Sequence, residues 1–283
     1  MNLSDRRQHV LAAAVATLAG IATLAPVAHA QEATDTSSSS VAGRREARRA
    51  KQAEQAEQNA AKGSSEAQAE ARYPNATRKN PGAKASAKGA KRLQALVTLF
   101  NDKKNDEARS AADAILADAD ASTYEKAFAA QLAAQLAIGA EDYDAALRHI
   151  GTAVDADILD NDQHYTLLLQ RAQLQIRDKD YAAALASADR FLSETQSNDP
   201  SALATKGNAL YRLERYAEAA DALRPAVAAQ PDRSDLQQLL ADSLARSGKG
   251  DEALRIAEQA AGGNPGDKQA QFNLAQNYIQ SKQ

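Results

Sequence analysis

The chain has 283 residues, of which 44% are hydrophobic but only 4% aromatic, and it contains neither Cys nor Trp. Without Cys it has no disulfide framework, no thiolate metal site and no Cys nucleophile. The formal net charge of −3 conceals an asymmetry, because residues 31–92 carry 13 Lys+Arg and 7 Asp+Glu whereas residues 93–283 carry 19 and 29. A basic segment therefore precedes an acidic body.

Residues 1–30 have the features of a secretory signal peptide. Arg6 and Arg7 form a basic start, residues 10–24 are an apolar run, and Ala28-His29-Ala30 is a small-x-small cleavage site. We predict cleavage after Ala30 and export to a bacterial periplasm. The alternative is a retained membrane anchor, because about 18 apolar residues can just span a bilayer.

Residues 31–92 contain almost no large apolar side chains. Such a segment cannot bury enough surface to offset its ordering entropy, so we predict a disordered or transiently helical basic linker. Its densest basic part, residues 44–51, has no interleaved aromatic for base stacking, and export removes it from nucleic acid, so we predict no nucleic-acid partner. We interpret it as a solvated tail, with contact to anionic lipid, cell-wall polymer or the acidic body as the alternative.

From Leu93 onward, apolar and small residues recur at helical spacing in pairs of segments joined by short turns. The sequence therefore predicts five helical hairpins followed by a lone helix. The predicted hairpins pair residues 93–100 with 107–116, 124–138 with 143–154, 163–176 with 181–192, 200–213 with 216–228 and 234–246 with 251–261, and the lone helix spans 268–279.

The fourth and fifth hairpins align without a gap at a spacing of 34 residues. Small residues occupy the same three places in several hairpins, which lets helices approach closely. These residues are Ala134, Ala146 and Ala153 in the second hairpin, Gly207, Ala219 and Ala226 in the fourth, and Ala241, Ala253 and Ala260 in the fifth. The pattern resembles the tetratricopeptide repeat (TPR) family, whose unit is a helix–turn–helix of 34 residues.

The resemblance covers residues 93–283 and implies an all-α, TPR-type helical-hairpin solenoid. The implied repeats are 93–121, 122–160, 163–199, 200–233 and 234–267, with a capping helix at 268–282. The first repeat departs from the family pattern, because Leu96 and Ile115 stand where small residues are usual. Solenoids of this kind bind protein segments on their concave side. By the family register, the groove candidates are Gln173, Arg177, Asn208, Tyr211, Arg212, Asp242 and Arg246.

Arg177, Arg212 and Arg246 hold equivalent positions in three successive repeats. A row of guanidinium groups favours an acidic ligand or a C-terminal carboxylate, which arginine binds in a bidentate manner. The alternative is that these arginines pair with nearby carboxylates and only keep an acidic body soluble. The carboxylates within reach are Asp178, Glu214 and Asp242.

The sequence contains no Gly-rich phosphate loop, no His-Glu-x-x-His and no Gly-x-Ser-x-Gly. We therefore predict a non-enzymatic protein with no cofactor and no metal. After signal cleavage two histidines remain, His149 and His164, and we interpret both as solvated or capping residues. The acidic loop 155–162 lacks the Gly and the closing Glu of a calcium loop, so a solvated loop with helix-capping Asp is favoured.

Three short motifs, at residues 124–127, 142–146 and 191–195, resemble exported TPR proteins that accompany TonB-type energy-transduction systems. This resemblance implies a role in coupling inner-membrane motor complexes to outer-membrane receptors. We therefore predict a periplasmic TPR scaffold that mediates protein–protein interactions in envelope complexes, in TonB-linked transport or outer-membrane biogenesis. The alternative is a cell-wall accessory protein that binds anionic polymer through its basic tail.

Overall fold

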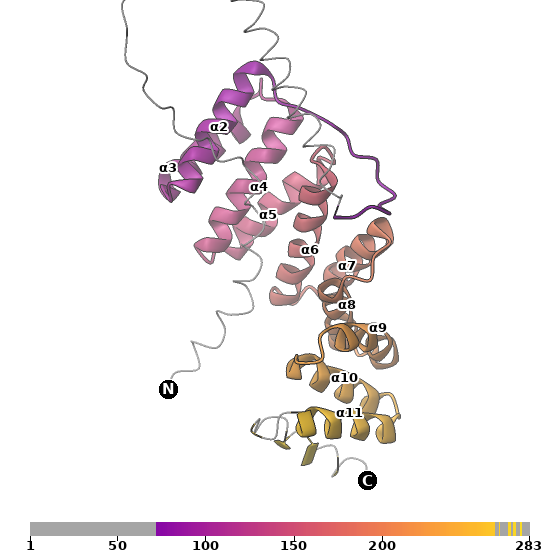
Figure 1. Ribbon diagram of the computed structural model, residues 1–283. Helices are drawn as coiled ribbons and strands as arrows, with labels where there is room; N and C mark the ends of the chain where they lie inside the picture. Colours follow the sequence, from indigo (N-terminus) through magenta and orange to yellow (C-terminus); the bar gives the residue numbers. More distant parts are fainter. Residues whose placement is uncertain (1–71, 264–265, 267–270, 273, 276–277, 279–283) are drawn as a thin grey trace, which may run out of the picture. The chain divides into compact units, whose positions relative to one another are not determined.

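The computed structural model describes residues 72–263, 266, 271–272, 274–275 and 278 (Figure 1). Every regular element in this part of the chain is a helix. The helices are α2 (Ala87–Asn101), α3 (Asn105–Ala117), α4 (Thr123–Gly139), α5 (Tyr143–Asp155), α6 (Asn161–Arg177), α7 (Tyr181–Thr195), α8 (Pro200–Arg212), α9 (Tyr216–Ala229), α10 (Ser234–Arg246) and α11 (Gly250–Gly263). The predicted signal peptide, the tail up to residue 71 and most of the predicted capping helix lie outside the described residues.

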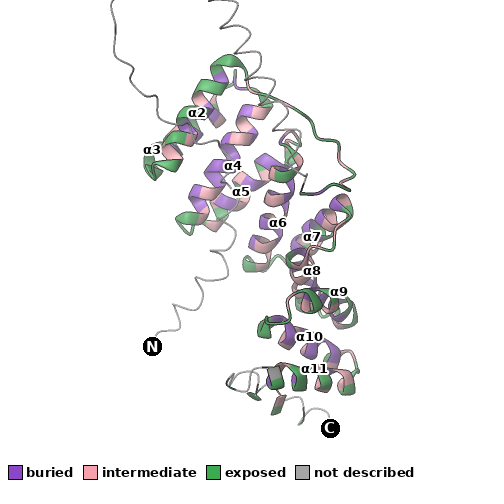
Figure 2. Ribbon diagram, in the orientation of Figure 1, coloured by how far each residue is buried: buried purple, intermediate pink, exposed green. Residues whose placement is uncertain are grey.

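These helices form five successive hairpins, which confirms the predicted all-α hairpin architecture. Each hairpin pairs a first helix, helix A, with a second, helix B: α2 with α3, α4 with α5, α6 with α7, α8 with α9, and α10 with α11. Helix B of each hairpin also packs against helix A of the next, and several neighbouring A helices touch, such as α6 with α8 and α8 with α10. The core consequently lies between consecutive helices, where buried residues gather in Figure 2.

Small residues hold these helices close together, as predicted. The Ala134, Ala219 and Ala241 side chains are at most 1% exposed. Gly207 shows why the site must be small, because a Cβ placed on it would lie 2.5 Å from Cγ of the fully buried Leu223. No real Cβ tolerates that separation, so helices α8 and α9 can only meet at this distance around glycine.

The turn between helix A and helix B is the same in all five hairpins. One residue adopts a left-handed conformation in each turn: Lys103, Glu141, Lys179, Glu214 and Gly248, with φ between 58° and 81°. The residue after it donates its backbone N–H to the carbonyl five positions earlier, for example Arg215 to Leu210 at 2.9 Å. This hydrogen bond is the Schellman closure of a helix C-terminus. Only the fifth turn uses glycine at the left-handed position.

The first hairpin begins earlier than predicted. Helix α2 starts at Ala87, inside the predicted linker, because Ser86 caps it by accepting a hydrogen bond from the Gly89 N–H at 3.0 Å. Ser86 also donates to the Glu125 carboxylate of α4, 2% exposed, which receives Arg92 at 2.8 Å as well. Burial raises the pKa of Glu125, but these hydrogen bonds outweigh burial and leave the pKa below its ordinary value. The ionised carboxylate therefore fastens α2 to α4.

Part of the predicted linker also packs on the third hairpin. Residues 73–78, which we name the strap, cross the loop before α6 and the end of α7. Tyr73 is only 6% exposed, and its ring meets Tyr165 at 5.2 Å and Phe191 at 5.6 Å, both edge to face. The prediction of a disordered or transiently helical linker up to residue 92 therefore does not hold for the strap or for residues 87–92 of α2, because single side chains such as Tyr73 supply contacts that local composition does not reveal.

Candidate functional site

The three arginines of the predicted row each end a helix A, and in each case a tyrosine begins helix B of the preceding hairpin. Arg177 ends α6 and faces Tyr143 of α5, while Arg246 ends α10 and faces Tyr216 of α9. Arg212 ends α8, and Tyr181 begins α7 in the preceding hairpin. The repeat therefore places a tyrosine–arginine contact at the turn-side end twice, whereas Arg212 and Tyr181 hold the equivalent sequence positions without such a contact.

Arg177 lies directly over the Tyr143 ring, with Cζ 3.5 Å from the ring centroid. A guanidinium at this distance interacts favourably with the aromatic face. The pair lines a hollow of about 250 Å³ together with Glu141, Asp142, Asp144, Leu147 and Asp178. Arg177 is thus engaged with a ring and surrounded by carboxylates, which makes this end of the row net acidic.

Arg246 belongs to a denser cluster with two tyrosines and one aspartate. Its Cζ lies 5.3 Å from the Tyr216 ring centroid and 5.7 Å from that of Tyr211, and Nη1 donates to the Tyr216 hydroxyl at 3.4 Å. The Tyr211 hydroxyl donates to Asp242 Oδ2 at 3.2 Å, joining α8 to α10. Burial raises the pKa of Tyr211, and the Asp242 charge adds to the rise, so this hydroxyl remains a donor at neutral pH.

Arg212 differs from its two equivalents. Its side chain is exposed, and within residues 72–263 no hydrogen bond, ion pair or ring contact engages it. Gln173 and Asn208 are half-buried on α6 and α8, and their side chains likewise form no hydrogen bond to a described residue. Arg212 and Asn208 on α8 therefore leave one free guanidinium and one free amide in the middle of the row, and Gln173 on α6 leaves a second free amide.

The structure does not show the alternative, in which the three row arginines form ion pairs with nearby carboxylates. Among the described residues, no ion pair within 4.0 Å joins the three row arginines to Asp178, Glu214 or Asp242. Two of the arginines use tyrosine rings in place of carboxylates. Of the predicted groove residues, the structure brings Tyr211, Asp242 and Arg246 into one cluster, whereas Gln173 and Arg177 lie on α6, and Asn208 and Arg212 on α8.

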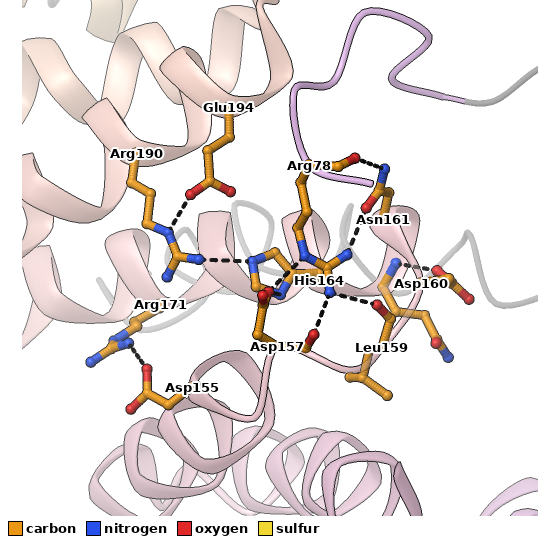
Figure 3. Close-up of polar contacts among 11 residues, drawn as sticks. Arg78, Asp155, Asp157, Leu159, Asp160, Asn161, His164, Arg171, Arg190 and Glu194 are labelled. Carbon is orange, nitrogen blue, oxygen red and sulfur yellow. Dashed lines mark hydrogen bonds and ion pairs between the residues drawn. The ribbon is translucent and has the colours of Figure 1, made fainter. Parts of the chain in front are cut away.

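His164 corrects the prediction that both histidines are solvated or capping. It is fully buried in the first turn of α6, between the guanidinium groups of Arg78 and Arg190 (Figure 3). Burial, reinforced by these two cations, lowers the pKa of His164 to about 4. His149 is half-buried, and burial lowers its pKa as well. His164 is therefore a neutral core residue at physiological pH.

The acidic loop contains the predicted helix cap. Asp160 caps α6 by accepting a hydrogen bond from the Gln163 N–H at 2.8 Å, which confirms its capping role. Asp157 pairs with Arg78 at 2.6 Å, and Asp155 pairs with Arg171 at 3.1 Å. The described residues contain no group of three His, Cys, Asp or Glu side chains that could hold a metal ion.

The strap is the feature that sequence reasoning missed. The Arg78 guanidinium bonds to the Asp157 carboxylate, to the Asp157 and Leu159 carbonyls and to the Asn161 side chain, all between 2.6 and 2.9 Å (Figure 3). The available signal was Tyr73, the first aromatic residue of the chain, followed five positions later by an arginine.

No helix in the described part of the chain is long and apolar enough to cross a bilayer.

Comparison with known proteins identifies the architecture. The chain matches the family model described as tetratricopeptide repeat at residues 132–202, 204–268 and 239–282, just over half of its length. No curated protein matches it. Its structure is similar to YrrB, described as a TPR protein with an unusual peptide-binding site, with a TM-score of 0.54, 17% identity and coverage of 64% of this chain and 89% of YrrB.

Two further similar structures are those of MamA proteins. MamA from Desulfovibrio magneticus RS-1 has a TM-score of 0.51 and 13% identity, covering 65% of this chain and 98% of MamA. MamA AMB-1 has a TM-score of 0.52 and 14% identity, covering 64% and 94%. At such identities these likenesses show the fold alone. With the family match and the five consecutive hairpins, they establish that the chain belongs to the tetratricopeptide repeat family.

Proposed function

We propose that this chain is a non-enzymatic scaffold that binds a protein segment along the turn-side ends of α6, α8 and α10. The observation that carries the proposal is the repeated tyrosine–arginine pair with a free Arg212 at its centre. Rigid aromatic rings flanked by arginine are the side chains that most often dominate binding energy at protein interfaces. The peptide-binding site described for YrrB, a protein of the same family, supports a peptide as the ligand class.

The charges along the row favour a segment of mixed charge. Arg212 is free to bind a carboxylate in bidentate geometry. The hollow beside Arg177 is lined by Glu141, Asp144 and Asp178, so a cationic or neutral polar group fits there better than an acidic one. We therefore propose an acidic residue of the ligand at Arg212 and a basic or polar residue at the hollow.

We further propose that the scaffold works in the periplasm, in envelope assemblies such as TonB-linked transport or outer-membrane biogenesis. The predicted signal peptide at residues 1–30 supports this location. Cell fractionation with N-terminal sequencing tests it: we expect a periplasmic protein that begins at Gln31. A chain that keeps residues 1–30 in the cytoplasm would contradict the proposal.

Binding is tested by photo-crosslinking from position 212 in cells, followed by mass spectrometry. We expect envelope proteins to be captured from position 212 and not from position 148, an exposed arginine on α5. Arg212→Glu should then weaken binding of the captured partner about tenfold or more, because it removes a charge-assisted hydrogen bond. Arg148→Glu makes the same change of charge away from the row and should leave binding unchanged. Equal effects of the two substitutions would reject the site.

A further inference from the structure

The strap packs at the other end of the third hairpin. Helix α6 runs from Asn161 to Arg177 and α7 returns from Tyr181 to Thr195. Arg177 therefore marks the turn end, whereas Asn161 and Thr195 mark the open end. The contacts of the strap lie at the open end, away from the tyrosine–arginine row.

We propose that the open end of the third hairpin is a peptide-binding site, which the chain closes with its own residues 73–78. The ligand it fits is an extended segment with an aromatic residue followed five positions later by arginine. A partner segment with this pattern gains access when the strap is released. The strap thus shows the chemistry of the ligand and also keeps the site closed.

The receiving surface has a separate pocket for each end of the ligand. Tyr165 and Phe191, both fully buried, form an aromatic corner that holds the Tyr73 ring edge to face. Without that ring the apolar surface of this corner would be open to water, which is unfavourable. The pocket therefore selects an aromatic side chain.

The second pocket binds the Arg78 side chain, and every hydrogen-bond partner of that side chain is an oxygen acceptor. The Arg78 side chain, 9% exposed, donates to one carboxylate, two backbone carbonyls and one amide oxygen, all from the loop between α5 and α6 and the first residue of α6 (Figure 3). The Asn161 side chain returns a hydrogen bond to the Arg78 carbonyl at 3.0 Å. Lysine cannot satisfy this planar set of acceptors, so the pocket selects arginine.

The strap can leave without unfolding a helix. It has no regular secondary structure, and the one backbone hydrogen bond that joins it to the hairpins, among the described residues, runs from the Thr77 N–H to the Glu194 carbonyl at 2.8 Å. Residues 79–86, which connect it to α2, are mostly exposed. Segments with so few backbone contacts open far more readily than core helices.

The test uses the full chain and a labelled peptide with the sequence of residues 72–79. We compare the wild type with a strap-released variant, Tyr73→Ser with Arg78→Ser, by fluorescence anisotropy. Docking in cis acts as a competing ligand at high effective concentration, so the variant should bind the peptide at least tenfold more tightly. Peptides with Tyr73→Ala or Arg78→Lys should each lose at least tenfold in affinity.

A matched pair of charge changes separates recognition from a general effect of charge. Asp157→Arg on the strap-released chain should abolish binding of the peptide, whereas Asp155→Arg, which makes the same change at a carboxylate that does not contact the strap, should leave binding unchanged. Equal affinity of wild type and variant, no binding to either, or dimers of the variant in place of peptide binding would overturn the proposal. Hydrogen exchange on the wild type is independent of any substitution: a Thr77 amide as slow as the core amides of α6 would also overturn it.

Discussion

The turn end and the open end of the third hairpin differ in how deeply their contacts are buried and in whether those contacts recur in other hairpins. At the turn end, the Arg177–Tyr143 contact repeats in the fifth hairpin as Arg246–Tyr216, and its members are half-buried or exposed. At the open end, Tyr73, Tyr165 and Phe191 form one aromatic cluster, almost wholly buried and without an equivalent in another described hairpin. The repeated end belongs to the shared scaffold, whereas the unique end depends on a segment outside the repeats.

The two ends of the hairpin should contribute different amounts to the free energy of unfolding. An exposed arginine over a ring contributes about 0.5–1 kcal/mol, and more when water is excluded. A fully buried aromatic side chain contributes several times as much. Substitutions at the open end should therefore affect stability, and those at the turn end should mainly affect binding.

The largest expected effect is that of Phe191→Ala. Phe191 is 0% exposed and contacts Tyr73 and Tyr165 edge to face, so its loss leaves a cavity that costs about 3–5 kcal/mol. Chemical denaturation of the full chain measures this loss. Tyr216→Ala, at the turn end, removes a half-buried ring and should cost clearly less. A larger loss for Tyr216→Ala would contradict the comparison.

Acid should weaken the open end through His164. Its pKa is about 4 in the folded chain and 6.5 in an ordinary setting, so between these values the unfolded chain binds a proton that the folded chain excludes. Stability should therefore fall by roughly 3 kcal/mol as the pH drops from 6.5 to 4. Arg78 and Arg190 oppose the charged imidazole, whereas Asp157 and Glu194 favour it.

The measurement compares the free energy of unfolding of the wild type and His164→Gln between pH 7 and pH 4. The carboxylates titrate in both proteins, so the difference between the two curves isolates His164. His149→Gln is the matched control and should change the slope less, because His149 is only half-buried. Parallel curves for wild type and His164→Gln would show that His164 is not held neutral.

The sequence predicts the features that repeat and misses the contact that occurs once. The hairpin recurs along the chain, and small-residue positions such as Gly207 reappear 34 residues later in the fifth hairpin, so each copy supports the interpretation of the others. The strap has no copies: Thr77 and Glu194 are 117 positions apart, and the sequence marks the contact only by Tyr73 and, five positions later, Arg78. The prediction for His164 is wrong for the same reason, since the start of a helix is usually solvated and here Arg78 and its neighbours cover it.

Within the regular scaffold, two glycines should respond to alanine with opposite signs. Gly207→Ala places a methyl group against the buried Leu223 and should destabilise the chain by about 1–3 kcal/mol. Gly151 in α5 has open space around the position that a methyl group would take, with no atom within 4 Å. Gly151→Ala should therefore stabilise the chain by up to about 1 kcal/mol through helix propensity. Thermal unfolding measures both, and a Gly207→Ala variant as stable as the wild type would contradict the close approach of α8 and α9.

The smallest effect concerns the shared turn. Glu214 has φ of +61° where the fifth hairpin has Gly248, at +81°. A side chain in this conformation costs about 1–2 kcal/mol, while glycine loses more entropy on folding, about 0.5–1 kcal/mol. Glu214→Gly should therefore raise stability by less than about 1 kcal/mol, and Gly248→Ala should lower it by a similar amount. Because both changes lie in the turns of the fourth and fifth hairpins, peptide binding at the open end of the third hairpin should stay constant in both variants. A change in that binding would mean that the third hairpin is coupled to the turns of its neighbours.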